Sequence, residues 1–162
     1  FSRGAELELK YQIFKNLNLK SSLAYLDTWT SKFSYSIAGD NVMIGGGREA
    51  AMSPKLSSSL SINYKQKSIF GSVNHSFKDG YYFSDSHDMM SKEYALTNFS
   101  AGKDFGDFKI KAWVNNIFDK RYAIRGFYFG LIPPNYEDKL WLSYGEPRHY
   151  GISIEYEFIG PN

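Results

Sequence analysis

The segment Tyr150-Gly151-Ile152-Ser153-Ile154-Glu155-Tyr156-Glu157-Phe158 alternates between two kinds of side chain without interruption. Large apolar residues stand at every second position, and glycine, serine or glutamate stands between them. Because successive side chains of a β-strand point to opposite faces, the pattern predicts a strand with one apolar and one polar face. Such a strand suits either a soluble sandwich or the wall of a membrane barrel with lipid outside and water inside.

The same period of two returns along most of the chain. It predicts six further strands, over residues 6–13, 19–25, 55–65, 69–77, 93–105 and 108–114, of which only the segment 93–105 does not keep one phase. No segment supports a helical period over more than two turns. The sequence therefore predicts an all-β fold.

The composition narrows the class of protein. The 162 residues allow one domain, with 13 Tyr and 13 Phe, and the mean hydropathy is -0.41. No apolar run approaches the length of a transmembrane helix, whereas many aromatic residues fit the interfacial girdles of a β-barrel. The net charge of +2 argues neither for nor against a nucleic-acid partner, but no Lys/Arg cluster stands out, and we expect no such partner. The absence of cysteine excludes disulfides, thiol nucleophiles and cysteine metal sites.

The connections between the predicted strands alternate strictly between short and long. Short turns lie at 14–16, 66–67 and 106–107, and long loops lie at 32–52, 79–91 and 121–147. A soluble sandwich has no reason to sort its loops by length, whereas outer-membrane barrels have short periplasmic turns and long extracellular loops. We therefore expect an antiparallel up-and-down transmembrane β-barrel segment of about seven strands, with neighbours in sequence order.

Charge placement agrees with this expectation. A Lys or Arg on the lipid face at the bilayer midplane costs about 2 to 4 kcal/mol, and the apolar faces of the six strands with a clear phase carry no charge at their centres. The charged residues expected to face the lumen are Glu6, Glu8, Lys10, Lys20, Lys55, Lys109, Lys111, Glu155 and Glu157. His75 falls on the apolar face, where we expect it in the interfacial belt. The expected aromatic anchors at the interfaces are Tyr11, Tyr25, Tyr64, Tyr156 and Phe158.

The strand count predicts that the chain is a piece of a larger barrel. Seven strands place the two ends at opposite rims, whereas complete bacterial barrels have an even number of strands. The first strand would also expose an unpaired edge, which a membrane does not tolerate. The chain begins at Phe1 without a leader, so we expect either a removed signal or an internal fragment.

Three short motifs resemble TonB-dependent outer-membrane receptors. They are Arg3-Gly4-Ala5-Glu6-Leu7-Glu8, then Val114-Asn115-Asn116-Ile117-Phe118-Asp119-Lys120-Arg121-Tyr122, then Gly145-Glu146-Pro147-Arg148-His149-Tyr150-Gly151 with its closing strand. Their order and spacing, together with Ser53-Pro54-Lys55, cover nearly the whole chain. The tail Ile159-Gly160-Pro161-Asn162 departs from the family, whose members usually stop at the aromatic residue.

The resemblance implies that residues 1–162 are the C-terminal part of a plugged, roughly 22-stranded barrel in the bacterial outer membrane. It implies import of a scarce small ligand, such as an iron-siderophore complex or cobalamin, powered by the inner-membrane TonB complex. The plug and the TonB-contacting segment of the family lie upstream, so this chain is expected to supply wall and loops. Its implied partners are outer-membrane lipid and the remaining strands and plug of the same protein.

Candidate binding residues lie in the long loops. A possible metal cluster consists of Asp85, His87 and Asp88, although its spacing matches no defined site and a solvated polar loop is the simpler interpretation. Contacts to an anionic or aromatic ligand at the extracellular mouth would come from Arg48, Arg125, Tyr128, Trp141 and Arg148. The run Gly45-Gly46-Gly47-Arg48 lacks the features of a phosphate-binding loop and is interpreted as a mobile loop. No catalytic triad can be assigned, so we expect neither an enzyme nor a cofactor.

Two alternatives to the importer stay open. One is a small self-contained outer-membrane barrel that acts as an adhesin or structural protein. The other is a soluble carbohydrate-binding or lipid-binding module, which would bury its apolar faces in a shared core. The gene sequence upstream of Phe1 would separate them, because only an importer places a plug and further strands there.

Overall fold

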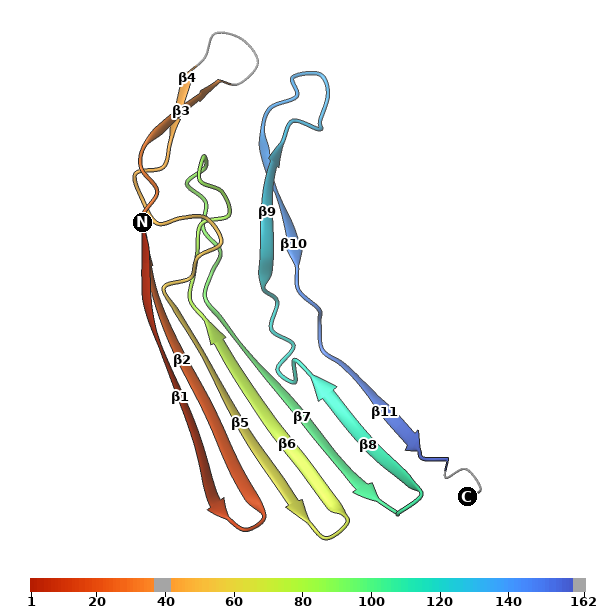
Figure 1. Ribbon diagram of the computed structural model, residues 1–162. Helices are drawn as coiled ribbons and strands as arrows, with labels where there is room; N and C mark the ends of the chain where they lie inside the picture. Colours follow the sequence, from red (N-terminus) through yellow and green to blue (C-terminus); the bar gives the residue numbers. More distant parts are fainter. Residues whose placement is uncertain (37–41, 159–162) are drawn as a thin grey trace.

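The computed structural model describes residues 1–36 and 42–158, and its largest element is an antiparallel sheet of seven strands (Figure 1). Its strands, in spatial order, are β1 (Ser2–Phe14), β2 (Leu17–Thr28), β5 (Leu56–Gln66), β6 (Ile69–Lys78), β7 (Tyr94–Asp104), β8 (Phe108–Asn115) and β11 (His149–Tyr156). Each strand pairs antiparallel with its neighbours. This confirms the predicted all-β, up-and-down order. The described residues hold no helix long and apolar enough to cross a membrane.

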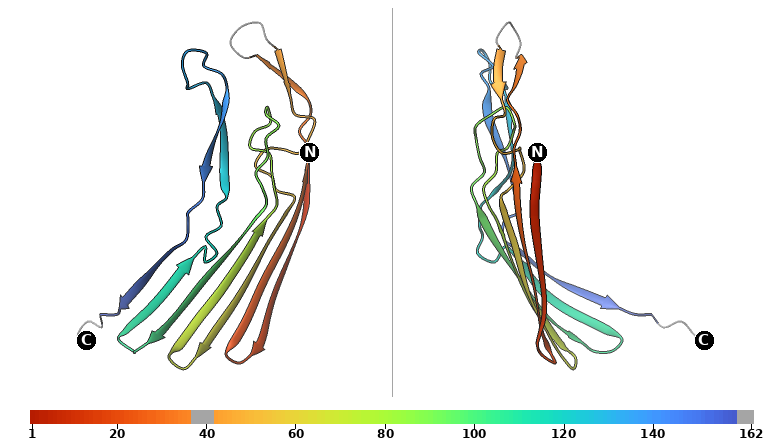
Figure 2. Two further views of the ribbon diagram at one scale, coloured as in Figure 1. Left: turned by 180° about the vertical axis from the view of Figure 1, so that it is seen from behind. Right: turned by 60° about the vertical axis from the view of Figure 1, so that its left-hand side comes forward.

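Loop length sorts by rim, as the sequence predicts. The turns that join β1 to β2, β5 to β6 and β7 to β8 all lie at the lower rim in Figure 1, and the three long connections lie at the upper rim. In the turn between β7 and β8, Gly106 adopts a φ of 94°, a left-handed conformation that glycine reaches without strain. The sheet is curved, as the right-hand view of Figure 2 shows.

Two of the predicted loops contain strands, which corrects the prediction. The loop 32–52 holds the hairpin of β3 (Phe33–Ser36) and β4 (Val42–Gly45), and the loop 121–147 holds that of β9 (Ala123–Phe129) and β10 (Lys139–Tyr144). These segments are rich in aromatic and β-branched residues, which favour strands even where the run is short. The tail Ile159 to Asn162 lies outside the described residues.

The register aligns one apolar row across the whole sheet. The row consists of Tyr11, Leu19, Ile62, Val73, Phe99, Val114 and Tyr150, one residue from each strand. It also settles the phase of β7, in which Phe99 lies on the apolar face and Asn98 on the polar face. Lys103 lies on the apolar face next to Ile69, close to the short-turn rim. His75, on the same face, hydrogen-bonds through Nδ1 to Thr97 Oγ1 at 2.9 Å.

Of the buried side chains in the described chain, the sheet contributes only Thr28 and Tyr94, at the long-loop ends of β2 and β7. Ile152 and Ile154 of β11 are 72% and 71% exposed, so no described residue packs over this part of the apolar face. The buried side chains gather at the long-loop end, and they are Thr28, Tyr81, Phe83, Ser91, Tyr94 and Asn116. The core of the described chain therefore lies between its loops, directly above the sheet.

Candidate functional site: the loop assembly above the sheet

The loop assembly consists of the described residues of the three long connections, 29–55, 79–93 and 116–148. Backbone hydrogen bonds join the first two connections, from Gly46 N to Asp85 O at 2.8 Å and from Met52 N to Tyr82 O at 2.8 Å. The glycine run that was interpreted as a mobile loop is thus tied to its neighbour. Within the first connection, Lys55 Nζ pairs with Glu49 Oε1 at 2.6 Å. This ion pair lowers the pKa of the Glu49 carboxyl. Lys55, which we expected to face the lumen, therefore lies at the long-loop rim, one residue before β5 begins.

Arg48 holds the first connection against the second. Its guanidinium donates to His87 O at 2.5 Å and to Ser84 O at 3.2 Å, and it pairs with Asp88. The same group lies 4.2 Å from the centre of the Tyr82 ring. Only 13% of the Arg48 side chain is exposed. Arg48, a sequence-predicted ligand contact, is therefore occupied with protein contacts in the described structure.

The candidate metal ligands Asp85, His87 and Asp88 each contact a different part of the protein. Asp85 Oδ1 accepts a hydrogen bond from Ala51 N at 2.7 Å, and Asp88 pairs with Arg48. The His87 ring stacks on Tyr128 of β9, with centroids 3.7 Å apart and planes 6° from parallel. Within residues 1–36 and 42–158 no three acidic, histidine or cysteine side chains form a group suited to a metal ion.

Tyr81 and Phe83 join the second connection to the third. The Tyr81 hydroxyl donates to Ile124 O at 3.1 Å, and the Phe83 ring lies so close to Gly126 that a Cβ there would come within 2.6 Å of it. Burial raises the pKa of the Tyr81 phenol, and it also raises that of Tyr128, against an opposing effect of Arg48. Sequence reasoning missed both core residues. The run Tyr81-Tyr82-Phe83 within an otherwise polar loop was the available signal.

The hairpin of β9 and β10 has one packed face and one free face. Its packed face carries Tyr128, and its free face carries Arg125, Phe127, Phe129, Lys139 and Trp141. Cross-strand pairing sets Trp141 beside Phe127 and Lys139 beside Phe129, and the three aromatic side chains are all exposed. The Trp141 indole donates to Phe129 O at 3.2 Å. Two cations and three exposed rings thus share one surface at the outer end of the molecule.

Arg148 lies apart from this surface, just before β11 at the rim of the sheet. Its backbone N donates to Asp119 Oδ1 at 2.8 Å, and its guanidinium reaches Ile117 O at 3.5 Å. The five predicted ligand contacts therefore do not converge. Arg125 and Trp141 share the free face of the hairpin, Arg48 and Tyr128 are packed between loops, and Arg148 holds the rim.

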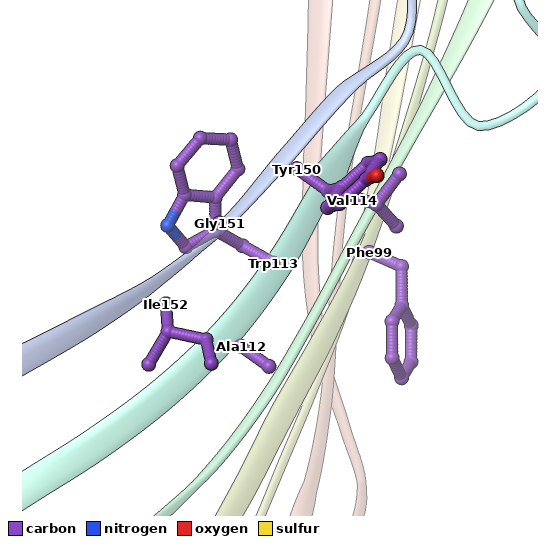
Figure 3. Close-up of a pocket in the computed structure, with 7 residues that line it drawn as sticks. All are labelled: Phe99, Ala112, Trp113, Val114, Tyr150, Gly151 and Ile152. Atoms are coloured by element: carbon purple, nitrogen blue, oxygen red, sulfur yellow. The ribbon is translucent and has the colours of Figure 1, made fainter.

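Below the loops, the two faces of the sheet differ sharply. A shallow hollow of about 570 Å³ is lined by residues that include Phe99, Val114, Tyr150 and Ile152, and Figure 3 shows these side chains. Phe99, Val114 and Tyr150 are in register on the apolar face, and Ile152 lies on the same face, paired with Ala112. Trp113 alternates to the polar face, where its ring lies over Gly151 and its Nε1 donates to Ser153 Oγ at 3.1 Å. The hollow offers no charged group and suits contact with lipid.

Comparison with known proteins agrees with this geometry. The family model for the TonB dependent receptor-like β-barrel matches residues 1–117. Among solved structures, the chain is similar to the ferric yersiniabactin uptake receptor FyuA from Yersinia pestis, with a TM-score of 0.75 and 16% identity over 98% of this chain and 23% of that one.

Two further solved structures have the same fold. The siderophore receptor PiuA from Acinetobacter baumannii gives a TM-score of 0.74 and 18% identity over 94% of this chain and 21% of that one. The ferripyoverdine receptor of Pseudomonas aeruginosa gives a TM-score of 0.62 and 17% identity over 97% of this chain and 19% of that one. The chain thus spans between 19% and 23% of the length of these receptors.

Proposed function

Because the chain belongs to the TonB dependent receptor-like β-barrel family, which is found in the bacterial outer membrane, we propose that it forms wall and extracellular loops of a TonB-dependent importer. The observation that carries the proposal is the seven-stranded sheet with one uncharged apolar row across all strands. A sheet with an apolar face toward lipid and a polar face toward a lumen is the wall of an outer-membrane barrel.

The open edges of the sheet support a larger barrel. In the described structure β1 and β11 each have one neighbouring strand, so each leaves one edge of backbone groups without a partner strand. Hydrocarbon offers no hydrogen bonds to such groups, and membrane sheets therefore close on themselves. We propose that the remaining strands of the same protein pair with both edges, and that residues 1–162 are the C-terminal portion of the barrel.

The remaining partners follow from the family. We propose that a plug, elsewhere in the complete protein, fills the lumen beside the polar face, and that the inner-membrane TonB complex acts through an N-terminal region. The cargo we propose is a scarce metal chelate of the iron-siderophore class, with cobalamin as the other candidate. The similar solved structures named for ferric yersiniabactin and ferripyoverdine support the first of these classes.

The free face of the hairpin is the proposed contact surface for the cargo. Arg125 and Lys139 supply positive charge beside Phe127, Phe129 and Trp141. Guanidinium groups bind carboxylates in a bidentate manner, and exposed rings stack on planar groups and on cations. The surface therefore suits an anionic ligand with aromatic or flat portions. Arg48, Tyr128 and Arg148 would support this surface indirectly, through the packing of the loops.

Uptake by cells that make the complete protein tests the proposal. Iron-55 loaded onto catecholate, phenolate and hydroxamate siderophores, and cobalt-57 cyanocobalamin, are the probes. We expect energy-dependent uptake of one probe, and Arg125→Met should weaken its binding about tenfold, as for the loss of one charged hydrogen bond. Arg3→Met, at the other end of the chain on the apolar face, is the matched control. Failure to take up any probe would contradict the siderophore and cobalamin classes.

The mobility of the purified chain in gels tests the alternative of a small self-contained barrel. If the chain closes alone, it runs as a compact monomer that boiling unfolds. We expect instead that the isolated chain aggregates or stays unfolded, because both edge strands lack partners. A compact, boil-sensitive monomer would favour the adhesin or structural role.

A further inference from the structure

Two motifs that lie far apart in the sequence, residues 114–122 and 145–151, meet in space at the base of the outer hairpin. We infer that they form a clasp that sets the orientation of the hairpin of β9 and β10 relative to the barrel wall. One motif leads into β9 and the other follows β10, so the clasp holds both ends of the hairpin at one point.

Asn116 is the centre of the clasp. It is 4% exposed, and its side-chain amide donates to Lys120 O at 2.9 Å and to Glu146 O at 3.1 Å. Its Oδ1 accepts from Lys120 N at 2.8 Å. One side chain therefore joins the residues before the hairpin to the residues after it. A buried amide whose donors and acceptor are all used in this way cannot be replaced without leaving polar groups unpaired.

Asp119 and Tyr122 add two further links between the motifs. Asp119 Oδ1 accepts a hydrogen bond from Arg148 N at 2.8 Å. Gly145 N donates to Tyr122 O at 3.0 Å, and a Cβ on Gly145 would run into the Tyr122 ring. Asn116 and Asp119 have φ values of 50° and 51°, in the left-handed region that Asn and Asp enter more readily than other side chains. These contacts explain why the two motifs hold these residue types.

The clasp is anchored in the barrel wall through β7. Ile117 N donates to Thr97 O at 2.9 Å, and Asn116 N donates to Asn98 Oδ1 at 2.9 Å. The Tyr94 and Tyr122 rings lie 4.5 Å apart, with Tyr94 buried. Since the clasp is joined to the wall at three places, the hairpin cannot tilt at its base without breaking these contacts.

The clasp therefore acts as a positioning device for the free face of the hairpin. Arg125 follows Tyr122 by three residues, and Trp141 precedes Gly145 by four, so both leave the clasp within a few residues. Fixing the base of so short a hairpin fixes the direction of its side chains. That these side chains meet cargo rests on the proposed function, whereas the orientation itself does not.

Distance measurements between spin labels test the orientation without any ligand. This chain has no cysteine, so Lys139→Cys on the hairpin and Asp107→Cys in the short turn between β7 and β8 give two labelling sites in it, and any cysteine elsewhere in the complete protein is replaced by serine first. We expect one narrow distance distribution in the parent protein. Asn116→Asp, which keeps the acceptor oxygen and loses the two amide donations, should broaden it about twofold.

Two variants and one control complete the design. Asn116→Gly keeps the left-handed backbone but removes the whole amide, and it should broaden the distribution further. Asp119→Gly removes only the link to Arg148 N and should broaden it less; because Asp119 is exposed, this variant serves if Asn116 variants do not assemble. Asn63→Ala, on the polar face of β5, is the control and should change nothing.

A distribution of parental width in the Asn116 and Asp119 variants, with heat-modifiable gel mobility proving that they are folded, would overturn the clasp. If it broadens while the complete protein takes up no probe, the clasp stands and the proposed function fails. If the parent protein takes up a probe and the distance distribution does not broaden in the variants, the proposed function stands and the clasp fails.

Discussion

The seven-stranded sheet and the loop assembly are stabilised in opposite ways. The sheet leaves its apolar row exposed, with Tyr150 79% accessible, whereas the loops bury Tyr81 to 5% and Asn116 to 4%. A β-sheet normally buries at least one face against protein. This sheet holds its strands together by backbone pairing and has surfaces made for lipid on one side and for polar contents on the other.

The difference indicates where each region obtains its stability. In the proposed importer, the sheet depends on surroundings outside this chain, on lipid against the apolar face and on neighbouring strands at both edges. The loop assembly carries its own core of aromatic rings and hydrogen-bonded polar side chains, including Arg48, Tyr81 and Asn116. Substitutions in the sheet should therefore impair membrane assembly, whereas substitutions in the loops should change only the local stability of the loop assembly.

A charge in the middle of the apolar row should produce the largest effect. Val73→Lys places an amine among Ile62 and Phe99, facing hydrocarbon, and should cost about 2 to 4 kcal/mol of folding free energy in lipid vesicles. Asn74→Lys, one residue along on the polar face, is the matched control and should cost far less. Denaturant titration of the complete protein in vesicles measures both. Equal losses would contradict the assignment of the two faces.

Loss of the Arg48 guanidinium should open the loops and leave the sheet intact. Arg48→Met keeps much of the side-chain volume but removes the hydrogen bonds to Ser84 O and His87 O, each worth about 1.5 to 3 kcal/mol when the donor is charged. We expect faster hydrogen exchange across residues 79–93 and unchanged stability of the sheet. Arg125→Met is the control, because Arg125 is exposed on the free face of the hairpin. Unchanged exchange in Arg48→Met would show that the contact does not hold the loops.

Removal of the Tyr81 hydroxyl should have the smallest effect. Tyr81→Phe loses the hydrogen bond to Ile124 O and should lower the stability of the loop assembly by about 1 kcal/mol. Tyr82→Phe is the control, because it keeps the ring beneath Arg48. Protease cleavage of the native loops measures the difference, and equal cleavage rates would contradict a role for the hydroxyl.

Alkaline pH probes the same residue in the unmodified protein. Burial raises the pKa of Tyr81 above its unfolded value, so the folded loops favour the neutral phenol. That contribution is fully present below pH about 10 and is lost as the pH rises through the folded-state pKa. Loop cleavage should therefore rise with pH above about 10, and less steeply in Tyr81→Phe. The same slope in both proteins would refute the assignment.

Much of the sheet could be predicted because its signal is local. The alternation from Leu56 to Tyr64, or from Tyr150 to Tyr156, is enough to predict a strand with two different faces. The length of each connection predicts the rim at which it lies. The hairpins inside the long loops were missed, since β3 has four residues and β10 has six, too few for a clear period. The segment 93–105 acquired a phase only when its neighbours β6 and β8 were in place.

The candidate site was predicted in part. Arg125 and Trp141 were selected by residue type, and the structure sets them on one free face. Arg48, Asp88 and His87 were selected by residue type as well, but they contact protein partners, and no pattern along the chain distinguishes the two groups. Whether a polar loop side chain is free or occupied depends on contacts across 30 or more positions, as between Arg48 and His87 or Tyr81 and Ile124.

The order of residues alone was enough for the strand period, the sorting of loops, the two chemically distinct faces and the family resemblance of the motifs. The joining of those motifs around Asn116, the packing of the loops into a core and the free face of the outer hairpin emerge only in three dimensions. The physical reason is range. Alternation in a strand comes from the geometry of adjacent peptide units, whereas the clasp depends on the amide of Asn116 meeting a carbonyl 30 residues away.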